Sequence, residues 1–416
     1  MILRGTNMIQ KKIRVLYVNT KFCGGGAEKV ARQLYEGESL NPNIETFFME
    51  GRKTNQCQKF IYPNKGIMKI INSIKSYMSN NQRIRDHYAT KKIIKVIKKY
   101  KIDIIHIHNI HGNYMGIKDI LEIQKYCKII WTLHDMWLLT GHCAHSIDCS
   151  KWYKEECKQC NRFDLYPMIR KDIANKMYMI KKSVIQQCNI TYILPSKWLW
   201  ENCNRSFLKE KPKKLIYNGV NTLTFIPKDK GILREKYKIG NNKFVLTFGC
   251  SDLKSSYKGM DIIIKALEEI KDKERYSLVF FGNKNNIEFN SKFECHHVGY
   301  IQNEAVMNEI YSLADIFILP SIAETFPCSI LESFAAGTPV IASDVGGVSE
   351  QINKSTGWLF KPGNVMQLTK LIEEACTDRM RLETMGVECR NRVEELFSEK
   401  QMLEEYKKLY ERIAVL

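Results

Sequence analysis

Long apolar segments are absent from this chain of 416 residues. A membrane-spanning helix needs about 18 or more consecutive apolar residues, and the apolar stretches here have only the length of strands. At the N-terminus, Met1–Thr20 contains basic residues but only the short apolar run Ile13–Val18. A signal peptide needs a longer apolar core than this. We therefore expect neither an integral membrane protein nor export through a signal peptide.

Acidic residues are scarce relative to basic ones: 45 Asp and Glu stand against 64 Lys and Arg, for a net charge of +19. A hydrophobic fraction of 44% nevertheless excludes a disordered or collagen-like chain. Between Arg52 and Lys101, 14 basic residues face one acid, Asp86, so most of the excess lies in one segment. Such a segment is compatible with nucleic-acid binding, with an anionic membrane surface, or with a solvated helical face.

Part of this basic segment has helical periodicity. Gly66–Met78 places Ile67, Ile70, Ile71, Ile74 and Met78 on one face. This pattern predicts an interfacial helix that docks on anionic lipid, or else a helix that packs on its own domain.

Apolar runs of strand length alternate with helical stretches in both halves of the chain. The predicted strands are Ile13–Val18, Ile102–Ile107, Lys128–Leu133, Ile190–Leu194, Phe244–Phe248, Tyr276–Phe281, Ile316–Leu319 and Pro339–Ala342. The predicted helices include Ala27–Tyr35, Lys91–Tyr100, Ile117–Lys125, Asp261–Lys271, Asn303–Leu313 and Lys400–Leu416. Alternating strands and helices predict an α/β protein with parallel sheets that helices cover on both faces.

The pattern lapses into a polar linker near residues 226–231 and then restarts. We therefore predict two tandem Rossmann-like domains, residues 1–221 and 222–398. A C-terminal helix, 399–416, is expected to pack back on the first domain. Ligands of open α/β sheets bind outside the carboxyl ends of the strands, so the functional residues should lie in the loops there.

Four of the 14 cysteines cluster in a predicted insertion, residues 141–161. They are Cys143, Cys149, Cys157 and Cys160, with the spacing C-x5-C-x7-C-x2-C. The closing two-residue gap lets two thiolates reach one tetrahedral ion, so we expect a structural zinc here, with four unrelated thiols as the alternative. His142 and His145 are candidates to replace one thiolate.

The most informative segment runs from Ile316 to Glu350. It contains Glu324 in a loop after a strand and, eight residues later, Glu332 on the helix that starts near Phe326. A carboxylate can accept hydrogen bonds from two hydroxyls of a sugar ring, and the free amides of a helix N-terminus can bind a phosphate. The segment therefore predicts a site for a phosphorylated sugar.

This segment resembles glycosyltransferase family 4, whose members are retaining enzymes of the GT-B architecture, and in particular the colanic-acid and capsular polysaccharide transferases. The matching residues are Ser321, Glu324, Glu332, Gly337, Pro339-Val340 and Gly346-Gly347 here, with Gly24–Glu28, Asn218–Asn221, Lys258-Gly259 and Val298–Tyr300 elsewhere. The sequence departs from the family pattern at two places. Thr325–Pro327 replaces the usual glycine after the first Glu, and Cys250 stands where the family often has Arg.

The resemblance implies a role for each matching residue. Catalytic roles fall to Glu324 (facing the donor sugar), Lys258 (at the diphosphate) and His134 (on the acceptor side). Donor binding falls to Glu332 (at the ribose), Lys254, Gly249, Val298, Tyr300, Phe326, Pro327, Cys328 and Ser329. The acceptor and phosphate loop would comprise Gly24, Gly25, Gly26, Glu28, His106, His108 and Asp135.

The implied architecture is two Rossmann-like domains facing a central cleft. The implied activity is transfer of a sugar from a nucleotide diphosphate-sugar to a glycan or lipid-linked acceptor, with retention of configuration and without a metal cofactor for catalysis. The chain has no Asp-x-Asp, the motif that holds a divalent ion in the other major transferase fold. We expect a cytoplasmic enzyme, peripheral on the inner face of the membrane, with no nucleic-acid partner.

Three alternatives remain. An NAD dehydrogenase would need Gly-x-Gly-x-x-Gly after the first strand, which Gly24–Ala31 does not supply. A GT-B epimerase or phosphorylase would share the fold but not the whole donor motif. A nucleic-acid-binding protein is suggested only by the charge.

Overall fold

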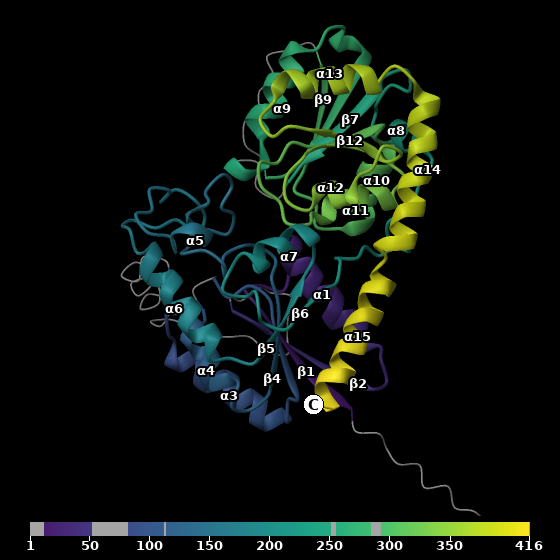
Figure 1. The fold of residues 1–416 in the computed structure, drawn as a ribbon. Coiled ribbons are helices and arrows are strands. Elements are labelled where there is room, and N and C mark those ends of the chain that lie inside the picture. Colours follow the sequence, from purple (N-terminus) through teal and green to yellow (C-terminus); the bar gives the residue numbers. More distant parts are fainter. Residues whose placement is uncertain (1–11, 52–81, 112–113, 251–254, 284–292, 416) are drawn as a thin grey trace, which may run out of the picture. The chain divides into compact units, whose positions relative to one another are not determined.

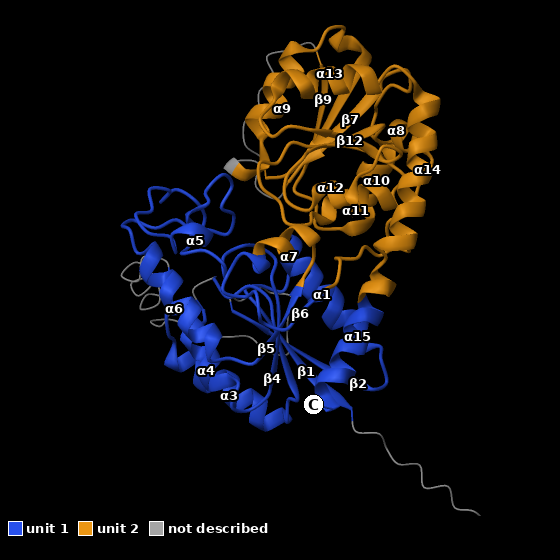
Figure 2. Cartoon of the chain, viewed as in Figure 1, with its two compact units in different colours: residues 1–193, 203–214, 403–416 blue, residues 194–202, 215–402 orange. Residues whose placement is uncertain are grey.

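The computed structural model describes residues 12–51, 82–111, 114–250, 255–283 and 293–415 (Figure 1). The chain forms two compact units (Figure 2). Unit 1 comprises Met1–Ile193, Cys203–Lys214 and Leu403–Leu416, and unit 2 comprises Leu194–Asn202 and Leu215–Met402. Lys254 and the predicted helix Gly66–Met78 lie outside the described residues.

Unit 1 is built on a six-stranded sheet with the order β2-β1-β3-β4-β5-β6. Its strands are β1 (Ile13–Asn19), β2 (Ile44–Glu50), β3 (Ile104–Ile107), β4 (Lys128–Thr132), β5 (Ile190–Leu194) and β6 (Lys213–Leu215). Strands β1 to β5 pair in parallel. The associated helices are α1 (Gly26–Ser39), α3 (His87–Tyr100), α4 (Ile120–Ile123), α5 (Lys151–Lys154) and α6 (Ala174–Gln186), with a 3-10 turn at Ile117–Asp119.

Unit 2 repeats this plan with the order β12-β11-β10-β7-β8-β9. Its strands, which also pair in parallel, are β7 (Phe244–Gly249), β8 (Tyr276–Phe281), β9 (Glu294–Gly299), β10 (Ile316–Leu319), β11 (Val340–Ser343) and β12 (Gly357–Phe360). Its helices are α8 (Lys230–Lys236), α9 (Met260–Glu269), α10 (Glu304–Leu313), α11 (Cys328–Ala335), α12 (Val348–Gln351), α13 (Val365–Ala375) and α14 (Arg379–Leu396), with 3-10 turns at Ser256–Lys258 and Lys273–Arg275.

Two further helices contribute residues to both units. They are α7 (Lys197–Asn204) and the C-terminal α15 (Glu399–Val415). The part of α15 from Leu403 onward belongs to unit 1, where Tyr406 and Tyr410 are almost fully buried. The tyrosine ring carries both a large apolar surface and a hydroxyl, so these two residues join the core while hydrogen-bonding to the sheet.

The central strands are buried on both faces because helices cover both sides of each sheet. The core of unit 2 accordingly forms two hydrophobic clusters, one containing Val245 and Phe317 and the other containing Leu246 and Ile318. Neighbouring residues of one strand point to opposite faces, which explains this division. The prediction of two Rossmann-like domains with parallel sheets is confirmed.

The strand order reverses beside the first strand of each sheet. In unit 1, β2 and β3 lie on opposite sides of β1, and in unit 2, β8 and β10 lie on opposite sides of β7. Ligands of such sheets bind at the carboxyl ends of the strands where the order reverses. The fold therefore directs attention to the loops after β1 and β3, and after β7 and β10.

Val298 and Gly299 match a loop of the family pattern, but here they are the last residues of β9, and Tyr300 directly follows the strand. Among the described residues, no helix is long and apolar enough to cross a membrane.

Candidate functional site

The loops after β7 and β10 bring a lysine and a glutamate into direct contact in unit 2. Lys258 Nζ lies 2.6 Å from Glu324 Oε1, and Ser321 Oγ donates a hydrogen bond of 2.8 Å to the same oxygen. Burial alone would lower the pKa of Lys258, but the Glu324 carboxylate outweighs it and raises the pKa above its ordinary value. The ammonium therefore keeps its charge while its side chain is still 33% exposed.

Two glycines allow this close approach of the loops. Gly259 has a φ of +67°, and a Cβ there would lie 2.0 Å from the carbonyl oxygen of Pro320. Gly346 has a φ of +58°, and a Cβ there would lie 1.7 Å from the carbonyl oxygen of Glu324. Only glycine combines this backbone conformation with such contacts, so both positions fix the loops that carry the ion pair.

The N-terminus of α11 lies on the same chain segment, directly after Glu324. Pro327 is its N-cap, and Cys328 and Ser329 begin the helix. The Phe326 side chain is only 4% exposed because it lies in the hydrophobic core of unit 2, where it stacks on Tyr217. Phe326 can therefore offer a ligand its backbone but not its ring.

Glu332 is also largely enclosed, with 8% exposure. It forms a side-chain hydrogen bond with Tyr311 on α10, and its charge helps burial to raise the pKa of that tyrosine well above the ordinary value. A buried carboxylate with a fixed partner is suited to hold ligand hydroxyls in one orientation.

Other predicted donor residues also lie at the carboxyl ends of strands. Gly249 is the last residue of β7, Val298 is the penultimate residue of β9, and Tyr300 directly follows β9. Tyr300 is 44% exposed.

In unit 1, histidines from neighbouring strands meet at the carboxyl edge. His108 follows β3 and His134 follows β4; Nδ1 of His108 lies 2.8 Å from Nε2 of His134. Burial is the main cause that lowers the pKa of both, to about 4 for His134 and well below the ordinary value for His108. Both rings are therefore neutral near pH 7.

A second pair stands beside the first. His111 Nε2 lies 2.8 Å from Asp135 Oδ2, and Asp135 Oδ1 accepts the backbone N–H of Trp137. Burial tends to raise the pKa of Asp135, but His111 and these hydrogen bonds hold it below the ordinary value. Asp135 is thus a fixed negative charge next to neutral His134.

His106 is directed into the domain instead. Its side chain is fully buried, with Nδ1 2.8 Å from the Tyr410 hydroxyl and Nε2 2.8 Å from Thr132 Oγ1. Both ring nitrogens are thus engaged within unit 1. This geometry gives His106 a place in packing rather than a free nitrogen for a ligand.

The glycine loop after β1 also contains its own anion. Gly25 is the N-cap of α1, and its N–H donates to Glu28 Oε2 over 3.1 Å. Gly24, Gly25 and Gly26 are exposed. A phosphate at this helix N-terminus would have to displace the Glu28 carboxylate.

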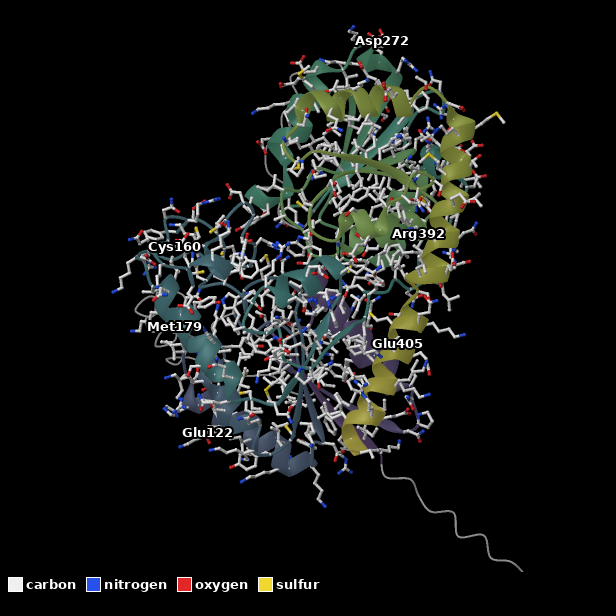
Figure 3. The ribbon with its side chains drawn as sticks, in the orientation of Figure 1. Glu122, Cys160, Met179, Asp272, Arg392 and Glu405 are labelled. Carbon is white, nitrogen blue, oxygen red and sulfur yellow. The ribbon has the colours of Figure 1, made fainter. Side chains whose placement is uncertain are left out.

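The predicted metal cysteines all line one small cavity of unit 1. Cys160 lies in the loop after α5 (Figure 3). Within the described ranges, no group of three or more His, Cys, Asp or Glu side chains already has an arrangement that could hold a metal ion.

Comparison with known proteins adds to this geometry. Residues 229–392 match the family model described as "Glycosyl transferases group 1", and residues 68–223 match "Glycosyltransferase Family 4". Together the two models cover most of the chain.

The chain belongs to glycosyltransferase family 4. The glycosyltransferase is 26% identical over 289 residues to WcaC of Escherichia coli K12, which is named for colanic acid biosynthesis; the match covers 68% of each chain. It is 29% identical over 163 residues to an N,N'-diacetylbacillosaminyl-diphospho-undecaprenol alpha-1,3-N-acetylgalactosaminyltransferase of Campylobacter jejuni. That match covers 38% of this chain and 42% of the relative.

A solved structure also has the same fold. HepE of Anabaena, in complex with UDP-glucose, superposes with a TM-score of 0.65 at 15% identity, over 96% of this chain and all of that one. The predicted family, GT-B fold and glycosyltransferase activity are confirmed. The alternative of an epimerase or phosphorylase is not supported.

The sequence did not predict how these residues pair. The Lys258–Glu324 contact and the His108–His134 contact each join residues on different loops, and the only signal was their common place after strands. Tyr311 was not predicted at all, because a tyrosine on an amphipathic helix is usually a core residue.

Proposed function

We propose that this enzyme transfers a sugar from a nucleotide diphosphate-sugar to a hydroxyl of a glycan or lipid-linked oligosaccharide, with retention, in the synthesis of a bacterial surface polysaccharide. Three similarities support this proposal. WcaC is named for colanic acid, the Campylobacter relative is named for an undecaprenyl diphosphate-linked acceptor, and HepE was solved with UDP-glucose.

The observation that carries the proposal is the Lys258–Glu324 pair at the strand reversal of unit 2. A leaving nucleoside diphosphate gains negative charge as the glycosidic bond breaks. A fixed ammonium and the first N–H groups of α11 are suited to stabilise that charge. In this proposal Lys258 and Cys328–Ser329 hold the diphosphate, Glu324 faces the sugar and Glu332 binds the ribose.

On the acceptor side, His134 acts as a neutral hydrogen-bond donor. His108 Nε2 is buried without a hydrogen-bond partner among the described residues. Leaving a buried lone pair without a hydrogen bond costs less free energy than leaving a buried N–H without one. We therefore assign the shared proton to His108 Nδ1, which makes His134 Nε2 the acceptor. The remaining proton of His134 is then on Nδ1, from which it can donate to a sugar hydroxyl.

Among the described residues, no carboxylate stands out as a covalent nucleophile. The proposed reaction is therefore front-side: the acceptor hydroxyl attacks the anomeric carbon on the face from which the diphosphate leaves, and the departing phosphate oxygen takes the hydroxyl proton. Lys258 holds the charge of the leaving group throughout.

A thermal-shift panel of nucleotides and nucleotide-sugars identifies the donor first, because a ligand that binds only the folded state raises the melting temperature. Calorimetry with the best nucleotide then compares wild type with Glu332→Ala. Loss of a hydrogen bond to a charged group predicts roughly 10- to 150-fold weaker binding. Glu274→Ala serves as the matched control, since Glu274 is exposed at the amino end of β8. Unchanged affinity in Glu332→Ala would show that the ribose assignment is wrong.

We also propose that the enzyme works on the cytoplasmic face of the membrane. Support comes only from the sequence: the basic excess between Arg52 and Lys101 and the apolar face of Gly66–Met78. Co-sedimentation should show binding to anionic vesicles and little to neutral ones. Equal binding to both, or none, would contradict an electrostatic attachment.

A further inference from the structure

The cysteine-rich insertion of unit 1 has no role in the proposed transfer reaction, yet four of its thiols converge. Cys143, Cys149, Cys157 and Cys160 line one cavity of about 20 Å³, which has room for one small body such as a water molecule or a metal ion. The four thiols share this cavity but are not arranged as a preformed metal site, so binding would require their side chains to close on the ion.

The groups around these thiols are those that commonly support a bound metal. The Gly141 N–H donates to Cys157 Sγ over 3.1 Å, a bond that stabilises a thiolate. His142 donates Nδ1–H to the Pro167 carbonyl oxygen over 3.1 Å, so its Nε2, 3.7 Å from Cys160 Sγ, is left as a lone pair for the Cys160 thiol or for an ion. The Gly141 contact orients Cys157 of the C-x2-C pair, and His142 lies beside Cys160, the other residue of that pair.

A buried lysine, Lys181, lies close to the four cysteines. Lys181 on α6 is fully buried, and its Nζ donates to the carbonyl oxygens of Trp137, Thr140 and Gly141 over 2.5, 3.0 and 3.3 Å. It also interacts electrostatically with Cys143, Cys157 and, more weakly, Asp135. No carboxylate forms an ion pair with Lys181 within the described part of the chain. A buried ammonium is costly unless a negative charge compensates it.

We propose that the thiolates of Cys143, Cys149, Cys157 and Cys160 bind one zinc ion, with Lys181 as the buried counter-cation of the centre. Four thiolates around Zn²⁺ carry a net charge of about −2, and the ammonium reduces it to about −1. The ion has no open position and takes no part in transfer. The zinc–thiolate centre supplies the negative charge that compensates the buried Lys181 ammonium. In turn, the ammonium compensates part of the negative charge of the centre.

This centre would stabilise the loop that follows the candidate acceptor histidine. The Met136 N–H donates to the Ala144 carbonyl oxygen over 2.7 Å, which closes the chain between Asp135 and the first cysteine. Lys181 bonds to three carbonyls of the same loop. Zinc binding at Cys143 therefore fixes the residues directly after His134 and Asp135.

The first test uses the wild-type protein, purified without chelator. Elemental analysis should find about one zinc per chain. Exchange for Co²⁺ should produce the intense thiolate-to-cobalt charge-transfer band of a multi-thiolate tetrahedral site. Protein with no zinc and no such band after reconstitution would overturn the proposal. Neither readout depends on transferase activity, so this result is independent of the proposed function.

The ligand set is tested by substitution. A Cys157→Ser, Cys160→Ser double variant should lose the zinc, while Cys188→Ser, a buried cysteine of unit 1 outside the cluster, should keep it. Circular dichroism checks that the double variant is folded. His142→Ala should keep one zinc and Cys143→Ser should not. The reverse result for this pair would replace Cys143 by His142 and overturn the four-thiolate assignment.

The role of Lys181 is tested by zinc competition with a chromophoric chelator. Groups outside the ligand shell typically change metal affinity 10- to 100-fold, so Lys181→Met should weaken zinc binding by about tenfold or more. Lys182→Met is the matched control, because the neighbouring Lys182 pairs with Glu156 at the surface, 2.7 Å away. Equal zinc affinities of the two variants would show that Lys181 is not the counter-cation.

Discussion

The two units share one sheet plan but carry different chemistry at their carboxyl edges. In unit 2 the loops after β7 and β10 present an ion pair, Lys258 and Glu324, beside the N-terminus of α11. In unit 1 the loops after β3 and β4 present neutral imidazoles, His108 and His134, that hydrogen-bond to each other. The same architecture therefore supports a site centred on an ammonium in unit 2 and, in unit 1, a pair of neutral imidazoles beside the fixed negative charge of Asp135.

This difference matches what each proposed ligand needs. A diphosphate carries charge that a cation and helix amides stabilise, whereas a sugar hydroxyl needs only a well-placed donor or acceptor. In unit 2, Gly259 and Gly346 let the loops of the ion pair adopt left-handed conformations that glycine takes without strain. Side-chain networks position the residues of unit 1 instead.

The strongest test of the charged edge is Lys258→Ala. Removal of one group that stabilises developing charge typically costs about 10²- to 10³-fold in kcat. We expect a loss of this size in steady-state kinetics with the nucleotide-sugar found above. His134→Ala should cost less than Lys258→Ala, because it removes a neutral hydrogen bond.

Lys265→Ala is the control for Lys258→Ala, since Lys265 is exposed on α9 in the same unit. It should retain wild-type kcat. If Lys258→Ala also stays within about threefold of wild type, or if His134→Ala costs more, the assignment of charge stabilisation to unit 2 fails.

The sequence predicted the interior strands of both sheets but not their edges. Continuous apolar runs such as Ile316–Leu319 and Tyr276–Phe281 are recognisable because both faces of a central strand are covered. The strands at the edges are β2, β6, β9 and β12. None of the four was predicted as a strand. Lys213–Leu215 and Glu294–Gly299 are polar and lack that signal, whereas β2 and β12 contain the apolar runs Phe47–Met49 and Trp358–Phe360, which are too short to be recognised.

The candidate site was predictable as a set of residues but not as a set of contacts. Family resemblance singled out Lys258, Glu324 and His134, and their positions after strands placed them at the carboxyl edges. Their partners depend on loop conformation, which the local sequence does not specify. His106 shows the limit most clearly. It lies two residues before His108 in the sequence, yet it packs against Tyr406 and Tyr410 of α15, at least 300 residues later.

A smaller effect is expected in the pH dependence of the stability of unit 1, through His134. Burial lowers the pKa of His134 to about 4, whereas an unfolded histidine titrates near 6.5. Between these values the unfolded chain binds the proton and the folded chain does not. The stabilisation is therefore complete above pH 6.5 and is lost as the pH falls toward 4. At 1.36 kcal/mol per pKa unit, the loss by pH 4.5 is roughly 2–3 kcal/mol.

The measurement compares wild type with His134→Asn at pH 7 and pH 4.5. Hydrogen exchange of β3 and β4 peptides, corrected for intrinsic rates, gives the unfolding free energy of unit 1. Glu38, also in unit 1, acts in the opposite direction because burial raises its pKa to about 7, but it is present in both proteins and cancels. The variant should lose less stability on acidification. Identical losses would mean that His134 titrates normally.

The smallest expected effect tests whether the tyrosine network of unit 1 is structural. The Tyr410 hydroxyl lies 3.0 Å from the Tyr17 hydroxyl and 2.8 Å from His106 Nδ1, all within the buried interior. Tyr410→Phe leaves both partners without this bond and should cost about 1–2 kcal/mol of unfolding free energy. Tyr237→Phe in unit 2 removes a half-buried hydroxyl from Glu309 and should cost less, about 0.5 kcal/mol.

Because none of the groups around Tyr410 faces the proposed ligands, kcat of Tyr410→Phe should stay within about threefold of wild type. A tenfold loss of kcat in folded Tyr410→Phe would instead connect His106 to the reaction, and the contrast between an ammonium-centred edge in unit 2 and an imidazole edge in unit 1 would no longer hold.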